Sequence, residues 1–119
     1  MTPNEDHTGK EGYAVNATSG KAALATSATD LPIGIIVEGG KTTGYSSVAI
    51  PDGFNGTLRV KLDATPGTVA LGTKLAITTT GTFKADPTSG GRTLMATALE
   101  SGSAGELVEA AIFTATGLT

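Results

Sequence analysis

Short apolar stretches, separated by glycine and proline, follow one another along the whole chain. Residues 58–62, Leu-Arg-Val-Lys-Leu, alternate apolar and cationic side chains, and this period of two is typical of a β-strand with one buried face. Residues 33–37 are apolar at successive positions apart from one glycine, which predicts a strand covered on both sides. Dipeptides such as Asn55-Gly56 and Pro66-Gly67 predict turns.

The spacing of these stretches predicts an all-β fold. We expect roughly ten short strands, which is typical of a small single-domain β-barrel or sandwich of short antiparallel strands. Seventeen glycines and many threonines and alanines also favour strands and turns over long helices.

Part of the pattern recurs. Residues 31–50 predict one β-hairpin, and an offset of 62 positions lays residues 33–38 over 95–100 and Gly40 over Gly102. The tripeptide at 18–20 falls near the one at 79–81, one place off the same offset. We interpret this as a pseudo-duplicated β unit, in halves of roughly 50–60 residues. Chance similarity between Gly-, Ala- and Thr-rich strands is the alternative.

Ser103–Phe113 fits two kinds of element. Ser103 and Glu106 match a helical capping box, and the apolar residues that follow fit one face of a helix. As a strand, every second residue from Val108 is apolar, and residues 45–50, which the offset lays over this segment, have β composition. We predict a strand, with a helix as the alternative.

Residues 1–12 predict a flexible N-terminal arm, and residues 13–119 the β-domain. The first twelve residues are polar with almost nothing to bury, so a frayed end is the alternative to an arm that orders on a partner. The only histidine, His7, is expected to be solvated there. A single histidine on an unanchored segment cannot hold a metal ion in a fixed geometry, and it has no fixed nucleophile beside it to activate.

Composition and charge exclude several classes of function. The 119 residues contain no cysteine, which excludes disulfides and Cys-based metal sites. The net charge of −3 and the scattered lysines and arginines argue against a nucleic-acid partner. The purest apolar run, Ile33–Val37, is too short to cross a membrane, and the first residues do not resemble a signal peptide. We expect a soluble protein made inside the cell.

Candidate chemistry is sparse. Residues 39–42, Gly-Gly-Lys-Thr, resemble the end of a phosphate-binding loop, but Ile35 stands where that loop needs a glycine and no helix is predicted to follow. A hairpin turn is the simpler interpretation. Glu38 and Glu100 end matching strands, so we expect them at surface turns and not as an acid–base pair. We predict no catalytic, cofactor-binding or metal-binding residue, and no enzyme.

Four stretches resemble, in their order, the small capsid decoration or cement proteins of tailed bacteriophages: TDLPIGIIVEGG, GTLRVKL, PGTVALGTKLAITTTGTF and LMATALESGSAGELVEAAIF. The resemblance covers residues 12–113. It implies a non-enzymatic, head-stabilising virion protein that binds the major capsid protein on the capsid exterior as a homotrimer. Such a protein is made in the host cytoplasm and needs no cofactor.

Within that resemblance, the N-terminal arm is the expected capsid contact. The residues concerned are Thr2, Pro3, Asn4, Glu5, Asp6, His7 and Thr8. The arm has no strongly hydrophobic or aromatic anchor, which leaves the rim of the barrel as the alternative contact. The alternative functions are a fibre- or tail-associated β-domain of a phage and a small glycan- or ligand-binding β-barrel.

Overall fold

The computed structural model describes residues 1–51, 57–64 and 68–119. The secondary-structure elements within these ranges are all β-strands. The strands are β1 (Ala14–Thr18), β2 (Lys21–Leu24), β3 (Gly34–Glu38), β4 (Ser47–Ala49), β5 (Leu58–Lys61), β6 (Lys74–Ile77), β7 (Phe83–Ala85), β8 (Arg92–Ala98) and β9 (Leu107–Leu118). The predicted all-β class is confirmed. The turns predicted at Asn55-Gly56 and Pro66-Gly67 lie outside the described residues.

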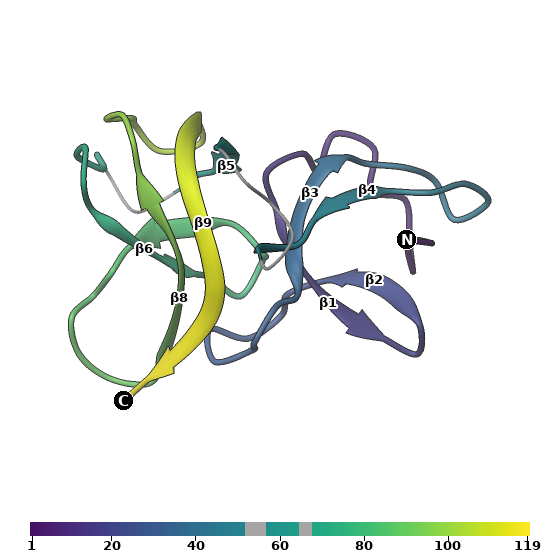
Figure 1. Ribbon diagram of the computed structural model, residues 1–119, viewed down its shortest axis with the longest axis horizontal. Coiled ribbons are helices and arrows are strands. Elements are labelled where there is room, and N and C mark those ends of the chain that lie inside the picture. Colours follow the sequence, from purple (N-terminus) through teal and green to yellow (C-terminus); the bar gives the residue numbers. More distant parts are fainter. Residues whose placement is uncertain (52–56, 65–67) are drawn as a thin grey trace.

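The strands form two antiparallel sheets that lie side by side (Figure 1). The first has the order β2-β1-β3-β4 and lies near the N-terminus, and the second has the order β5-β9-β8-β6-β7 and includes the C-terminal strand. Backbone hydrogen bonds join the sheets, because Ala14 N donates to Gly81 O (2.8 Å) and Lys61 N donates to Gly12 O (3.0 Å). The two sheets therefore belong to one compact body.

The two sheets repeat one another strand for strand. With β1 matched to β6, β2 to β7, β3 to β8 and β4 to β9, the order β2-β1-β3-β4 becomes β7-β6-β8-β9. The residues that pair across the strands correspond as well. The pair Val15–Leu24 in the first sheet is equivalent to Leu75–Ala85 in the second, and Val15–Gly34 is equivalent to Leu75–Ala96. In the same way, the pair Ile36–Val48 is equivalent to Ala98–Ala110. Equal order and register at offsets of 60 to 62 positions agree with the predicted pseudo-duplication, and we call the halves the first and second units.

The second unit is closed by β5. Val60 in β5 pairs with Val108 in β9, at one edge of the sheet. Leu62, directly after β5, forms a parallel bridge with Phe83 in β7, at the other edge, and Asp63 N donates to Phe83 O (2.8 Å). One short segment thus ties both edges together and curls the sheet into a half-barrel.

The first unit is closed in the same way by the N-terminal residues. Met1 and Ser46, which precedes β4, exchange two backbone hydrogen bonds of 2.8 and 2.7 Å. Pro3 then forms a parallel bridge with Ala22 in β2. Met1 and Pro3 therefore correspond to Val60 and Leu62, and the N-terminal segment takes the place in the first unit that β5 and Leu62 take in the second.

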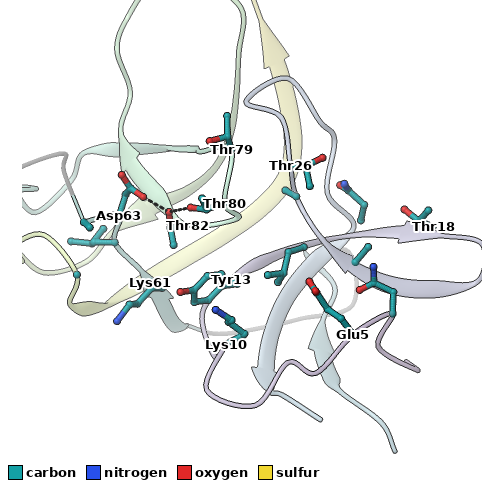
Figure 2. Close-up of a pocket in the computed structure, with 18 residues that line it drawn as sticks. Glu5, Lys10, Tyr13, Thr18, Thr26, Lys61, Asp63, Thr79, Thr80 and Thr82 are labelled. Atoms are coloured by element: carbon teal, nitrogen blue, oxygen red, sulfur yellow. Dashed lines mark hydrogen bonds between the residues drawn. The ribbon is translucent and has the colours of Figure 1, made fainter. Parts of the chain in front are cut away.

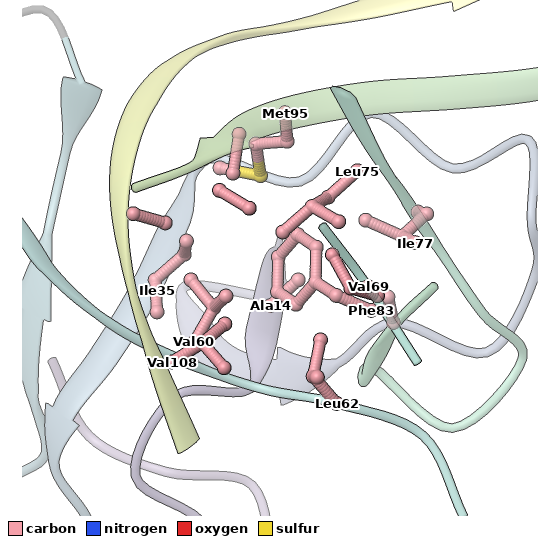
Figure 3. Close-up of a cluster of buried hydrophobic side chains, with 14 residues drawn as sticks. Ala14, Ile35, Val60, Leu62, Val69, Leu75, Ile77, Phe83, Met95 and Val108 are labelled. Carbon is pink, nitrogen blue, oxygen red and sulfur yellow. The ribbon is translucent and has the colours of Figure 1, made fainter. Parts of the chain in front are cut away.

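The main hydrophobic core lies in the second unit (Figure 3). Phe83 is its largest buried side chain, with Leu75, Ile77 and Met95 beside it, and the first unit adds Ile35 from β3. The core of the first unit is far smaller. Its buried members are Val15, Ala22 and Ile36. The two units thus share a topology but not the amount of apolar packing.

The segment that fits both a helix and a strand is a strand. Ser103 and Glu106 form a tight turn before β9, in which Ser103 N donates to the Glu106 carboxylate (2.6 Å) and Glu106 N donates to Ser103 O (3.1 Å). The Glu106 carboxylate makes its half of the capping box, but Glu106 N bonds the backbone carbonyl of Ser103, and β9 continues from there by pairing with β5 and β8. Long-range pairing therefore overrides a local helix signal.

Candidate functional site

A groove of about 900 Å³, which we call the threonine-rich groove, lies between the two units (Figure 2). It is bounded by the N-terminal residues, by β1 and β2, by the residues after β5 and by the threonine-rich turn between β6 and β7. The lining residues are Asn4, Glu5, Lys10, Tyr13, Asn16, Thr18, Ala23, Leu24, Ala25, Thr26, Lys61, Leu62, Asp63, Ala64, Thr79, Thr80, Thr82 and Gly105.

One wall of the groove carries a network of hydroxyl groups. The Thr82 hydroxyl donates to the Asp63 carboxylate (2.8 Å) and lies 3.0 Å from the Thr80 hydroxyl (Figure 2). It also lies 2.7 Å from the Thr78 hydroxyl. Near the N-terminal wall, Lys10 Nζ lies 5.1 Å from the centre of the Tyr13 ring, within the range of a cation–π contact. The threonine hydroxyls are thus bonded to one another and to Asp63, and Lys10 contacts Tyr13 on the other side of the groove.

Asp30 holds the loop at the rim of this groove. Its carboxylate accepts hydrogen bonds from Asn16 Nδ2 (3.0 Å), Thr26 N (3.0 Å) and Ser27 N (3.2 Å). The bond from Asn16, followed by the two backbone bonds, lowers the pKa of the Asp30 carboxyl. Asp30 is therefore ionised at neutral pH and has a structural role.

The titratable side chains among the described lining residues of the groove are Glu5, Lys10, Tyr13, Lys61 and Asp63. No histidine occurs among its described lining residues, so no imidazole is placed to activate a threonine hydroxyl there. In the parts of the chain that the structure describes, no three His, Asp or Glu side chains lie close enough to hold a metal ion. Residues 39–42 lie between β3 and β4, at the turn of a hairpin.

The N-terminal segment differs from its prediction. The sequence predicts a flexible arm over residues 1–12, but the structure shows this segment bonded to the first unit. Thr2 O accepts from Ala22 N (2.8 Å), Asn4 N donates to Ala22 O (2.9 Å), and His7 N donates to Gly40 O (2.8 Å). The physical reason is that the edges of β2 and of the β3–β4 hairpin leave backbone groups unpaired, and a polar segment satisfies them without an apolar pattern of its own.

The seven residues predicted to contact the capsid fall into two groups. Pro3 and His7 are buried, so their side chains are not available to a partner in this structure. The other five stay predicted contacts; Asn4, Glu5, Asp6 and Thr8 are exposed, and Thr2 is half-buried. Asp6 is held by its neighbour, since its carboxylate accepts bonds from the hydroxyl (2.6 Å) and the backbone N (2.9 Å) of Thr8, and these bonds lower its pKa.

His7 is the clearest error in the sequence analysis. It is expected to be solvated, yet its side chain is 0% exposed. Its Nδ1 lies 3.5 Å from the Ser46 hydroxyl, and burial lowers the pKa of the imidazole. The sequence contains a signal for this burial, because the offset of 62 lays His7 over Val69, an apolar residue two positions before Leu71.

A second groove, which the sequence analysis missed, is apolar. It has a volume of about 320 Å³ and lies between the loop before β3 and the C-terminal half of β9. Leu31 and Ile50, which are 61% and 48% exposed, lie on it. The other lining residues are Pro32, Ile33, Pro51, Thr114 and Ala115. Large apolar side chains around one groove are typical of a contact surface.

Comparison of the chain with protein-family models and with curated proteins finds no match. In the described ranges, no helix has the length and hydropathy needed to cross a membrane.

Proposed function

We propose that the chain is a non-enzymatic structural protein of a phage virion, a decoration protein that binds the outer surface of the capsid and stabilises the coat lattice. The resemblance in the order of sequence elements supports this proposal. The observation that carries it is the apolar groove around Leu31 and Ile50. A small body that leaves large apolar side chains around one groove gains stability by covering them with another subunit.

We assign the apolar groove to contacts between copies in a homotrimer. The first unit has only a small buried cluster, so contacts between subunits would supply stability that its own core lacks. The groove is formed by the loop before β3 and by β9, and none of its described lining residues belongs to the N-terminal segment. Contacts between copies therefore leave the N-terminal segment available to the coat.

We assign the exposed N-terminal residues to the coat. Asn4, Glu5, Asp6 and Thr8 follow one another at the edge of the first unit, held in place by the bonds to Ala22 and Gly40. A prearranged polar edge binds a partner without the entropy cost of ordering a free arm. Repetition around a three-fold axis would add avidity to a small contact.

Replacing Leu31 with Asp tests the contact between copies. The wild-type chain is expected to be a trimer by light scattering, and Leu31→Asp is expected to weaken association by roughly tenfold or more, because a charge would be buried in the contact. Leu71→Asp is the matched control, since Leu71 is 67% exposed and does not line the groove. A wild-type monomer, or equal loss in both variants, would overturn this assignment.

Replacing Glu5 with Lys tests the contact with the coat. The measurement is sedimentation with undecorated capsids assembled from the coat protein of the same virus. Glu5→Lys is expected to remain a trimer and to sediment less, because it reverses a charge at the coat contact. Glu38→Lys, an exposed position at the end of β3, makes the same change in net charge and is expected to sediment as the wild type does. Sedimentation of Glu5→Lys at the wild-type level would refute the assignment of this edge.

The threonine-rich groove favours a second candidate, a glycan- or ligand-binding β-domain. Its threonine hydroxyls, Asn16 and Tyr13 are groups that bind sugars. This candidate would be favoured if the chain is retained on immobilised oligosaccharides, if Thr80→Val abolishes that retention, and if the chain does not bind capsids. Attachment to phage tails alone would favour a tail-associated domain.

A further inference from the structure

His7 lies in the middle of the segment that closes the first unit. Before it, Pro3 pairs with Ala22 in β2, and after it Lys10 N donates to His7 O (2.9 Å). His7 N itself donates to Gly40 O in the hairpin between β3 and β4. The backbone of His7 is therefore itself one of the points at which the closing segment is bonded to the first unit.

The imidazole is poorly supplied with hydrogen-bond partners. Nε2 is buried and has no partner among the described residues. Nδ1 faces the Ser46 hydroxyl at 3.5 Å, and that hydroxyl already accepts a bond from Gly40 N (3.1 Å). The hydroxyl proton is thus free to point at Nδ1, which places the proton of the neutral imidazole on Nε2. An imidazolium would bury two N–H donors with a single weak acceptor between them.

The nearby charges do not compensate for this burial. Glu5 and Asp6 favour the charged imidazole and Lys10 opposes it, but burial is the largest influence and lowers the pKa from its ordinary value of 6.5. On the packed hairpin, the charged residues Glu38 and Lys41 are exposed, and the Glu11 carboxylate accepts a bond from Gly39 N (2.9 Å). Lys21 in β2 is exposed too. None of these groups has a hydrogen bond to the ring.

The second unit shows that the fold does not need a histidine here. Val69 N donates to Gly102 O (2.8 Å), as His7 N donates to Gly40 O, and both pairs are related by the offset of 62. Val69 is buried in the main core. An apolar side chain therefore fills the equivalent position, and the titratable side chain occurs in the first unit alone.

We propose that His7 is an acid-sensitive latch whose protonation releases residues 1–10 from the first unit while the second unit stays closed. Release would free the backbone groups of Ala22 at the edge of β2 and of Ser46 before β4. Edge groups of this kind pair with strands of other chains. Mild acid would thus convert a closed unit into one with two open edges, and this holds whether or not the chain binds a capsid.

Amide hydrogen exchange of the full chain tests the latch. Between pH 7.5 and 5, and after correction for the intrinsic exchange rate, the amides of Asn4, Ala22 and Ser46 are expected to lose protection. As the pH falls from 6.5, the ordinary pKa of histidine, to the lowered pKa of His7, the fraction of molecules with residues 1–10 released should rise by up to about tenfold per pH unit. The amides of Val69 and Gly102 are expected to keep their protection.

His7→Val is the matched variant, because it installs the residue of the second unit. It is expected to keep the amides of Asn4, Ala22 and Ser46 protected down to pH 5. Equal loss of protection in His7→Val, or no loss in the wild type, would overturn the proposal. If His7→Val does not fold, the NMR titration of the wild-type imidazole decides, and an apparent pKa at or above 6.5 would also overturn it.

Discussion

At the scale of single residues, equivalent positions in the two units show which side chains the fold accepts. Gly34 in β3 corresponds to Ala96 in β8, yet only the second unit has room for a methyl group. A Cβ on Gly34 would collide with the carbonyl oxygen of Ala49 and would lie 2.6 Å from Val48 Cγ1. The closer packing of β3 on β4 therefore requires glycine.

We expect Gly34→Ala to lower the free energy of unfolding by about 1–3 kcal/mol, because β4 must move to admit the methyl group. Urea unfolding measures the change. Gly44→Ala is the control, since the nearest atom to its Cβ, Lys41 O, lies 3.7 Å away and no strained backbone angle is involved. An equal loss at both positions would show that contact with β4 is not its cause, because restricting the unfolded chain with alanine should by itself raise stability.

At the scale of elements, the N-terminal segment is a part of the fold that strand patterns do not reveal. Its pairing with Ala22 and Ser46 uses backbone groups, which any sequence provides. Its buried side chains, Pro3 and His7, are not residues that an apolar pattern picks out. For this reason the sequence of residues 1–12 predicts a flexible arm. The equivalent segment of the second unit includes β5, in which the alternation of apolar and cationic residues is the clearest of the chain.

A chain that begins at Tyr13 is expected to be less stable than the full chain by about 3 kcal/mol or more. It loses the backbone hydrogen bonds to Ala22, Ser46 and Gly40 and the burial of Pro3 and His7. Thermal or urea unfolding measures the difference. Glu5→Ala, at an exposed position, is the control and should change stability by no more than about 0.5 kcal/mol. Equal stability of the short and full chains would favour a free arm.

The sequence predicts most of the strands but only part of the site. Alternation identifies β5, and composition decides for a strand at β9 in spite of the capping-box residues. The threonine-rich groove depends on residues from both units, such as Tyr13 and Thr80, whose approach follows from how the sheets pack. The apolar groove likewise joins Leu31 to Ala115. Neither combination leaves a local pattern, because each brings together residues far apart in the sequence.

At the scale of the whole molecule, two units of equal topology have unequal cores. Phe83 in the second unit corresponds in strand register to Ala22 in the first, so a large aromatic ring is replaced by a methyl group at the matching place. The second unit therefore has more apolar packing to keep it closed. Opening of part of the protein should begin in the first unit, where the buried cluster is small and one closing residue is a histidine.

The matched registers have a consequence for how this chain can be engineered. Each half serves as a homologue of the other, so the protein contains its own two-sequence alignment. Gly40 and Gly102 coincide in it, and a Cβ on either would clash, with Tyr45 O in one half and with the Val108 side chain in the other. Such coincident positions are fixed by the shared architecture. Positions that differ fall into two kinds: His7 and Val69 suggest an exchange to test, whereas Gly34 and Ala96 differ because β3 packs more closely on β4 and leaves no room for a methyl group.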